Sequence, residues 1–409
     1  MSERSLNLKI WLPFIPAYMS FALLDILIVL YVVEYLKQDL IYVGLLEMVS
    51  EAVFIPSSAF WGYICDRLEH YKIFLTIPFL FMGIITLLVT HINNPYALLL
   101  IYGLFSFLLS MHKPAINLFI AESNPSDEWL QVITSYMLIK NITSSMGLLL
   151  GIFCSNLPYF LLFIGIGAFY LLSFTLSSLA IYEPKLKIER RITFIDKRLN
   201  AINYSLSLLR FANNPNYSSY VLKMISKQGT SFVRFLLGLL LFTLATSLIF
   251  TPMPILLKRA FIEQFIVFLI FFINSIASAI TYLFIGKIGE CGIRGVKISC
   301  LLRSILVLIL IPFLLNPSFF SIVIVSTIFA FMGIMWAIFD LSTNYLSLEL
   351  SPYGWMGLYF SLSKLGSLVG AFLGGFLTTL YGLTTTLVIG CVIFLSAFIT
   401  FLSLKESSL

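Results

Sequence analysis

The stretch WGYICDRLEHYK (residues 61–72) gathers acidic, basic and histidine residues between two long apolar runs. A second stretch with the same layout, GKIGECGIRGVK, begins at Gly286. In each stretch a glycine precedes an acidic residue by four positions, Gly62 before Asp66 and Gly286 before Glu290, and basic residues follow. We name the difference in residue number between these two glycines the repeat offset. The chain therefore contains a long internal repeat, which is informative about both architecture and site location.

The composition excludes a soluble globular protein. Hydrophobic residues make up 60% of the chain and charged residues 11%, against about 45–50% and about 25% in soluble domains. The apolar residues form runs of about 20, the length that crosses a bilayer as a helix. The first run contains Asp25 and is too long for a signal peptide, so we interpret it as a permanent span. The five cysteines show no metal-ligand spacing, and we expect no metal or cofactor.

Charge clusters and groups of Pro, Asn and Gly divide the chain into twelve predicted spans. The first six run over about 10–36, 40–63, 73–91, 95–121, 130–154 and 158–182. The second six run over about 232–257, 261–285, 298–315, 318–347, 356–380 and 384–404. The predicted domains are thus an N-terminal six-helix bundle (1–182), a linker (183–231) and a C-terminal six-helix bundle (232–409). The basic linker has apolar residues at helical spacing over 195–209, which predicts an amphipathic helix that binds lipid headgroups or covers the span ends.

The distribution of Lys and Arg predicts the orientation. Most of them fall in loops that share one side with both termini, the linker and residues 61–72. Because short cytoplasmic loops carry the excess of basic residues, this side is predicted to be cytoplasmic. The net charge of +6 is therefore a topology signal and does not indicate nucleic-acid binding. Arg303 stands about one turn inside its span, and we expect its side chain to snorkel to the surface.

Further residue pairs recur at nearly the same separation in the two halves. Each separation equals the repeat offset to within three positions, and the pairs are Glu122 with Glu349, Lys140 with Lys364, Gly151 with Gly375, and Lys37 with Lys258. Six spans per repeat is an even number, so both halves keep the same orientation in the membrane. Such parallel repeats are related by an axis along the membrane normal.

With twelve predicted spans, a long cytoplasmic segment between two sets of six and a G-x-x-x-D-R loop after the second span, the chain resembles the major facilitator superfamily of secondary transporters. The resemblance covers essentially the whole chain. The first loop fits the family signature at four positions, Gly62, Ile64, Asp66 and Arg67. The second copy keeps the glycine, the acidic residue and a basic residue, namely Gly286, Glu290 and Arg294.

The resemblance implies that these loops form a gate. It would have Gly62 allow close approach of spans two and eleven, Asp66 cap or pair at the cytoplasmic end of span eleven, and Arg67 join a charge network. That network would hold the cytoplasmic side closed in the outward-open state. Gly286, Glu290 and Arg294 would be the corresponding gate residues of the second half. The alternative for the basic residues is simple anchoring by the positive-inside rule.

Several ionisable residues are predicted to lie near the middle of the membrane. Lys113 lies nine residues before Glu122, and Asp340 lies nine residues before Glu349. This spacing places both about 13 Å inside the cytoplasmic surface. Asp25 and Glu51 lie at similar depths in spans one and two. Each such group costs about 2.5–3.5 kcal/mol to insert, so it usually faces a cavity or a partner.

The family resemblance implies which of these residues surround a substrate. Spans one, four, seven and ten would line the cavity, which assigns Asp25, His112 or Lys113, and Asp340 to it. Spans two, five, eight and eleven would form its edges, which adds Glu51, Lys140 and Lys364. Trp336 and Asn344 are further polar candidates. The alternatives are a structural ion pair of Lys113 with Asp25 or Asp340, a packed neutral His112, and a Glu47 that is solvated near the outer surface.

The favoured function is a secondary active transporter of a small solute that works by alternating access, as a monomer in the cell membrane. Proton coupling is predicted through Asp25 and Glu51, with Asp340 next, because burial disfavours the charged form of a carboxylate. The cations Lys113, Lys140 and Lys364 favour an anionic or carboxylated substrate. Small solute, coupling ion and membrane lipids are thus the expected partners.

Three alternatives compete with this function. Multidrug antiporters of the family usually carry G-x-x-x-G-P in span five, but here Gly147 and Gly151 are followed by Ile152 instead of Pro. An enzyme would need clustered catalytic or metal-ligating residues at a span end, and a channel would need a pore loop between spans. The sequence shows neither feature. One fold can host many functions, so the function has to be argued from the site residues.

Overall fold

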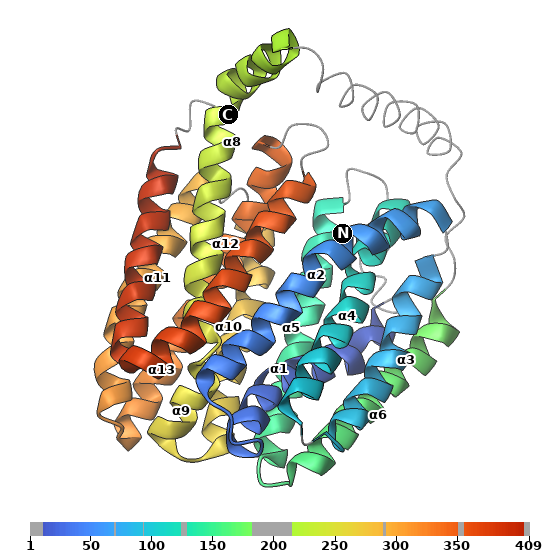
Figure 1. Cartoon of the computed structure of the whole chain (residues 1–409), viewed down its shortest axis with the longest axis vertical. Coiled ribbons are helices and arrows are strands. Elements are labelled where there is room, and N and C mark those ends of the chain that lie inside the picture. Colours follow the sequence, from blue (N-terminus) through green and yellow to red (C-terminus); the bar gives the residue numbers. More distant parts are fainter. Residues whose placement is uncertain are drawn as a thin grey trace.

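The computed structural model describes residues 11–68, 71–92, 94–123, 129–181, 215–288, 292–350 and 356–404. Every regular element in these ranges is a helix (Figure 1). The N-terminal half contains η2 (Leu12–Phe14), α1 (Ile15–Glu34), α2 (Leu40–Leu68), α3 (Tyr71–Val89), α4 (Pro95–Ser123), α5 (Trp129–Cys154) and α6 (Tyr159–Ala180). The C-terminal half contains α8 (Pro215–Phe250), α9 (Met253–Phe261), α10 (Gln264–Ile288), α11 (Gly292–Leu315), α12 (Phe319–Leu350) and α13 (Met356–Leu402).

Eleven helices in the described ranges are long and apolar enough to cross a membrane, as expected of a multi-pass membrane protein. The predicted spans eleven and twelve form one continuous element, α13. Its backbone leaves the helical region at Gly382, where φ is 84° and ψ is 174°. A glycine adopts such angles without steric penalty. This break lies at the predicted boundary between the two spans, but the count of twelve crossings stays a prediction.

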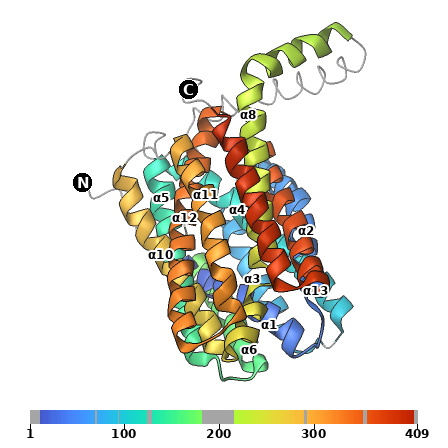
Figure 2. The ribbon, with the colours of Figure 1, turned by 90° about the vertical axis from the view of Figure 1, so that its left-hand side faces the viewer.

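Helix α8 differs most from the sequence expectation. It begins at Pro215, inside the predicted linker, and projects beyond its neighbours (Figure 2). It ends at Phe250, and Pro252 precedes the short helix α9. Proline has no N–H to donate, which favours a helix break at this point. The predicted span 232–257 is therefore divided between α8 and α9, and the predicted amphipathic helix at 195–209 falls outside the described residues.

The helices pack as two groups that meet along two interfaces. In the N-terminal half α1 contacts α5 and α6, α3 contacts α4 and α6, and α2 contacts α4. In the C-terminal half α13 contacts α8 and α11, and α12 contacts α10 and α11. The halves meet where α2 packs on α13 and α5 packs on α10. The repeat relates α2 to α10 and α5 to α13, so these two interfaces correspond to each other.

The two halves touch at one end of the bundle, which we name the closed end. It contains the α1–α2, α5–α6 and α9–α10 connections and lies at the bottom of Figure 1. There Lys258 of α9 forms an ion pair of 3.8 Å with Glu34 of α1. A Cβ built on Gly375 of α13 would lie 2.2 Å from the Leu40 carbonyl oxygen and 3.0 Å from the Gly44 Cα. The two backbones therefore touch because both residues are glycine.

The α1–α2 and α9–α10 connections show where the repeat aligns. Lys37 and Ile262 are the non-glycine residues with positive φ in the described chain, at 54° and 64°. Their separation in the sequence matches the repeat offset to within one position. The predicted pairing of Lys37 with Lys258 is therefore wrong by about one helical turn, and Ile262 is the structural equivalent of Lys37.

Candidate functional site

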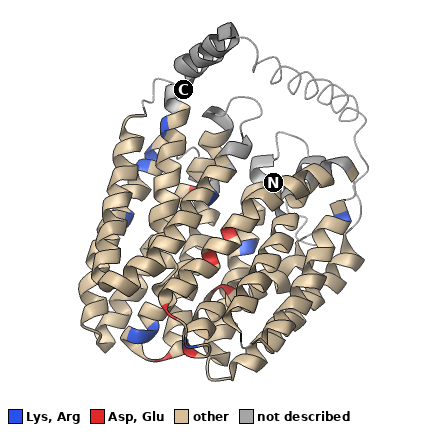
Figure 3. Cartoon of the chain, in the orientation of Figure 1, with Lys and Arg blue, Asp and Glu red and all other residues tan. Residues whose placement is uncertain are grey.

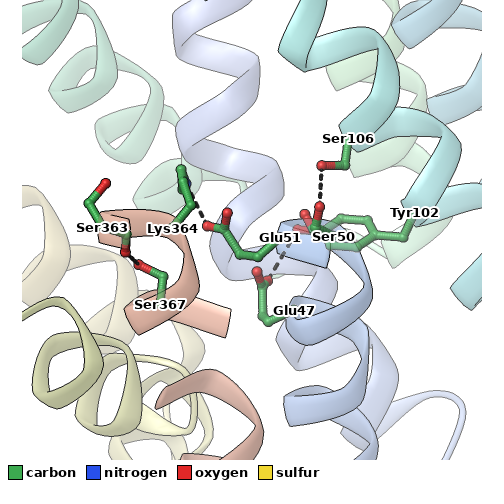
Figure 4. Close-up of polar contacts among 8 residues, drawn as sticks. All are labelled: Glu47, Ser50, Glu51, Tyr102, Ser106, Ser363, Lys364 and Ser367. Atoms are coloured by element: carbon green, nitrogen blue, oxygen red, sulfur yellow. Dashed lines mark hydrogen bonds and ion pairs between the residues drawn. The ribbon is translucent and has the colours of Figure 1, made fainter. Parts of the chain in front are cut away.

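An ion pair joins the two halves midway along the bundle. The Nζ atom of Lys364 on α13 lies 2.5 Å from Oε1 of Glu51 on α2 (Figure 4). The two side chains are 26% and 17% exposed, so both are largely withdrawn from water. The Lys364 ammonium also lies 4.9 Å from the centre of the Phe54 ring. Lys364 and Glu51, predicted separately as cavity-edge residues, are therefore direct partners across the interface.

Two further carboxylates lie near this pair. Glu47 is one helical turn from Glu51 and accepts a hydrogen bond of 3.2 Å from the Tyr102 hydroxyl of α4 (Figure 4). The charges of Asp25, Glu47 and Glu51 repel one another, and Lys364 attracts all three. Figure 3 shows acidic and basic residues together at mid-height of the bundle. We name Asp25, Glu47, Glu51 and Lys364 the central charge cluster.

Asp25 is the member of this cluster that lies on α1. Its side chain is exposed, although Leu24 and Ile26 beside it on α1 are 4% and 3% exposed. The charges of Glu51 on α2 and Lys364 on α13 both act on it. Asp25, Glu51 and Lys364 thus interact electrostatically, although they lie on three different helices.

Asp340 forms a second polar group, on α12. Its Oδ2 accepts a hydrogen bond of 2.9 Å from Tyr282 of α10, and the Asn344 amide nitrogen lies 3.4 Å from its Oδ1. The Tyr359 hydroxyl of α13 donates to Asn344 at 3.4 Å. Lys140 of α5 is attracted by Asp340 and repelled by Lys364. Asp340 and Asn344 therefore belong to one network, and Lys140 connects it electrostatically to the central charge cluster.

His112 lies among aromatic side chains of the N-terminal half. It is 4% exposed, and its Nε2 lies 3.0 Å from the Tyr18 hydroxyl, with which it shares a hydrogen bond. The rings of Phe14 and Phe79 are centred 5.3 Å and 5.0 Å from its own. Of the two alternatives for His112, this environment favours a packed histidine of the N-terminal half. The side chain of Lys113 lies outside the described part of the structure.

Arg303 is buried and does not snorkel, so that expectation is wrong. Its side chain is 3% exposed and points inward from α11. Nη1 donates to the Thr246 hydroxyl at 3.0 Å, and Nη2 donates to the Met332 carbonyl at 3.2 Å. The guanidinium carbon also lies 5.2–5.9 Å from the centres of four aromatic rings, Phe242, Phe250, Trp336 and Phe394. Cation–π contacts of this kind replace part of the lost hydration.

The aromatic surroundings of Arg303 and His112 are built at corresponding positions. The N-terminal half uses Tyr18, Phe79 and His112, and the residues one repeat offset later are Phe242, Arg303 and Trp336. Each half thus places a nitrogen-containing side chain among rings, but on different helices. Trp336, predicted as a substrate contact, is half-buried and packs against Arg303 and Phe242.

Replacing Arg303 with Phe, the residue at the corresponding position 79, is expected to leave the melting temperature unchanged or to raise it. Within the described chain no carboxylate pairs with Arg303, so its removal leaves no described partner charge behind, and a charge buried without a partner is costly. Arg303→Ala should lower the melting temperature, because it leaves a cavity. Thermal unfolding of the purified variants measures both. Equal destabilisation by the two substitutions would show that the guanidinium itself holds α11 in place.

The residues of the predicted gate are described only in part. Gly62 lies half-buried on α2, and Gly286 lies within α10. Arg294 lies on α11 with an exposed side chain. Glu290 and the side chains of Asp66 and Arg67 fall outside the described residues. The gating role of these loops stays a prediction from the family resemblance.

Sequence reasoning missed several members of the site. Glu47 was expected to be solvated near the outer surface, but it is half-buried and bonded to Tyr102. Its position one turn from Glu51 was a usable signal, because residues four apart share a helix face. No sequence pattern indicated that Tyr102 would donate a hydrogen bond to Glu47, or Tyr282 to Asp340. A tyrosine in an apolar span is compatible with packing, and only the fold shows which one meets a carboxylate.

Comparisons with known proteins bear on the family and on the helical fold. A sequence model described as Major Facilitator Superfamily matches residues 10–363. A crystal structure of the nucleoside transporter NupG is 14% identical with a TM-score of 0.68, over 98% of this chain and 99% of that one. A structure of proton-dependent oligopeptide transporters is also 14% identical, with a TM-score of 0.70 over 99% of this chain and 100% of that one. At these identities the likeness concerns the fold. No curated protein matches the sequence significantly.

Proposed function

Because this chain belongs to the Major Facilitator Superfamily, we propose that it is a secondary active transporter that moves a small solute by alternating access. The observation that carries the proposal is the ion pair of Glu51 with Lys364. It joins the two halves midway along the bundle, and Asp25 interacts with both of its charges. Charges at this depth are expensive to bury, and in membrane proteins they mark substrate and ion pathways.

The proposed movement is a rocking of the N-terminal half against the C-terminal half. The basic residues assign the closed end to the outer side of the cell membrane and both termini to the cytoplasm. With that orientation, the glycine contact of Gly44 with Gly375 and the ion pair of Glu34 with Lys258 close the outer side. The conformation described here is then the inward-facing one. Opening outward requires that both contacts separate.

Coupling to protons is proposed through Asp25 and Glu51, with Asp340 next. Three carboxylates of the central charge cluster face one ammonium group, so the cluster has a surplus of negative charge. Binding a proton relieves the repulsion between them. Because Glu51 also holds Lys364 of the other half, its protonation would weaken the link between the halves. A proton taken up on one side could thus change the balance between the two conformations.

The cations on the cavity side favour an anionic or carboxylated solute. Lys140 and Lys364 both lie at the interfaces between the halves, and Lys113 is predicted at the same depth. A lysine ammonium is a compact point charge that suits a carboxylate. We therefore expect a thermal-shift screen of small metabolites to select carboxylates, since a ligand of the folded state raises apparent stability.

Transport of the screened solute into proteoliposomes is expected to accelerate when a proton gradient is imposed. Asp25→Asn combined with Glu51→Gln should abolish this acceleration, because neither amide can carry the proton. Uptake of labelled solute, followed with and without the gradient, measures the effect. Asp39→Asn, on the connection between α1 and α2, is the matched control and should keep the acceleration. If the uptake rate of the unmodified chain were the same with and without the gradient, proton coupling would be refuted, but solute transport would not.

A further inference from the structure

The two interfaces between the halves are related by the repeat, but they are not equivalent in charge. At the closed end, Gly44 and Gly375 of the α2–α13 interface correspond to Phe268 and Gly151 of the α5–α10 interface, each at the repeat offset. Both pairs are in close contact, since a Cβ on Gly151 would lie 2.6 Å from the Phe268 ring. The correspondence therefore holds in space as well as in sequence.

The two interfaces differ at the positions that correspond to the ion pair of Glu51 with Lys364. Lys364 corresponds to Lys140, and its partner Glu51 corresponds to Ser275. The Ser275 hydroxyl faces α5, where it accepts a hydrogen bond of 2.9 Å from Ser145 and donates one of 3.3 Å to the Asn141 carbonyl. Ser275 thus lies within about one helical turn of Lys140, as the repeat requires. One interface pairs a lysine with a carboxylate, and the other offers a lysine and a hydroxyl.

Lys140 consequently lacks the carboxylate that its counterpart has. It is half-buried at mid-depth on α5, and among the described side chains no carboxylate lies within 4.0 Å of its ammonium group. Its attraction to Asp340 acts at longer range. A lysine at this depth is expensive to keep charged without a nearby anion. The α5–α10 interface therefore has no counterpart of the Glu51 carboxylate beside its lysine.

We propose that the carboxylate of the transported solute supplies this missing charge, binding between the Lys140 ammonium and the Ser275 hydroxyl. Ser275 then determines specificity, because it places a hydroxyl where the other interface has the carboxylate of Glu51. Hydroxyl hydrogens rotate to suit their partners, so Ser275 and Ser145 can turn their O–H groups toward an anion. This inference rests on the proposed transport function and assigns its solute to a chemical class.

Ser275→Glu tests the inference by placing the missing carboxylate in the chain itself. The probes are benzoate, lactate and succinate, each compared with its uncharged amide in thermal-shift titrations of the purified protein. We expect at least one carboxylate, and not its amide, to raise the melting temperature of the unmodified chain. In Ser275→Glu its apparent affinity should fall at least about tenfold, which is about 1.4 kcal/mol of binding free energy. Ser275→Gln, equal in size but uncharged, should lose less.

The outcomes separate this site from the proposed function. If no carboxylate binds, or if the shift survives in both Ser275→Glu and Lys140→Gln, the site is refuted. Lys140→Gln decides the matter alone if Ser275→Glu does not fold, as judged by gel filtration. Binding in detergent requires no transport, so a carboxylate that binds as expected but does not enter proteoliposomes would contradict the transporter and leave the site standing. Uptake of a solute without a carboxylate would contradict the site and leave the transporter standing.

Discussion

Glu51→Gln and Lys364→Met are each expected to lower the melting temperature and to reduce solute uptake, whereas the double variant should recover part of both losses. Either single change leaves one charge of the pair at mid-depth without its partner. An unpaired buried charge is more costly than the loss of the pair as a whole. The double variant removes both charges together. We therefore expect a positive coupling between the two positions, of about 0.5–3 kcal/mol for residues in direct contact.

A double-mutant cycle measures this coupling. The unfolding free energy of the four proteins is determined in the same detergent, and uptake is followed in proteoliposomes. Lys297→Met is a matched control, because the Lys297 ammonium donates to the Leu404 carbonyl within the C-terminal half. It should change uptake little. Strictly additive effects of the Glu51 and Lys364 substitutions would show that the pair does not couple the two halves.

Gly375→Ala is expected to force the closed end apart and to shift the protein out of the conformation described here. The added Cβ would lie 2.2 Å from the Leu40 carbonyl oxygen, so the backbones of α2 and α13 must separate. Overpacking of this kind typically costs about 1–3 kcal/mol. A cost that falls on one conformation alone changes the ratio of the two conformations about 5-fold to 150-fold. Solute transport should fall accordingly, because the cycle needs both conformations.

Spin labels placed on either side of the closed end measure this shift. Leu157 and Ile262 are exposed residues of the two halves, 46% and 75% exposed, so cysteines there accept labels without disturbing the interior. In a background without the native cysteines, the label-to-label distance should lengthen in Gly375→Ala. Gly165→Ala is the control, because nothing lies within 4 Å of a Cβ at that position of α6. An unchanged distance in Gly375→Ala would contradict the closure that we assign to this contact.

The fold could be predicted largely from the sequence because the membrane imposes a simple rule. Each span needs about 20 apolar residues, so charge clusters and turn residues reveal the boundaries of most helices. The prediction failed where the chain breaks this rule. Helix α8 begins at Pro215 among polar residues. The turn at Ile262 has a positive φ, but the sequence has no glycine at this position that would indicate it. Backbone geometry of this kind depends on packing that composition does not record.

The candidate site could be predicted only in part. Asp25, Glu51 and Lys364 were recognised because a charge in an apolar run is rare, and the structure brings these three together. The distance of a residue from the end of its span does not show toward which neighbours its side chain points. The prediction for Arg303 was therefore wrong. The sequence placed it near the membrane surface, whereas the structure buries it among the four rings.

The sequence by itself determined that this protein is helical, crosses a membrane many times and consists of two related halves. These properties follow from the length of the apolar runs and from the internal repeat, and both can be detected in the sequence without knowing how the helices pack. Only the tertiary structure decided that Glu51 pairs with Lys364, while Ser275 of α10 meets α5 at Asn141 and Ser145. The reason is physical: these partners lie in different halves of the chain, and their meeting depends on how two helix faces turn toward each other. Charge complementarity between halves is therefore a property of the packed molecule.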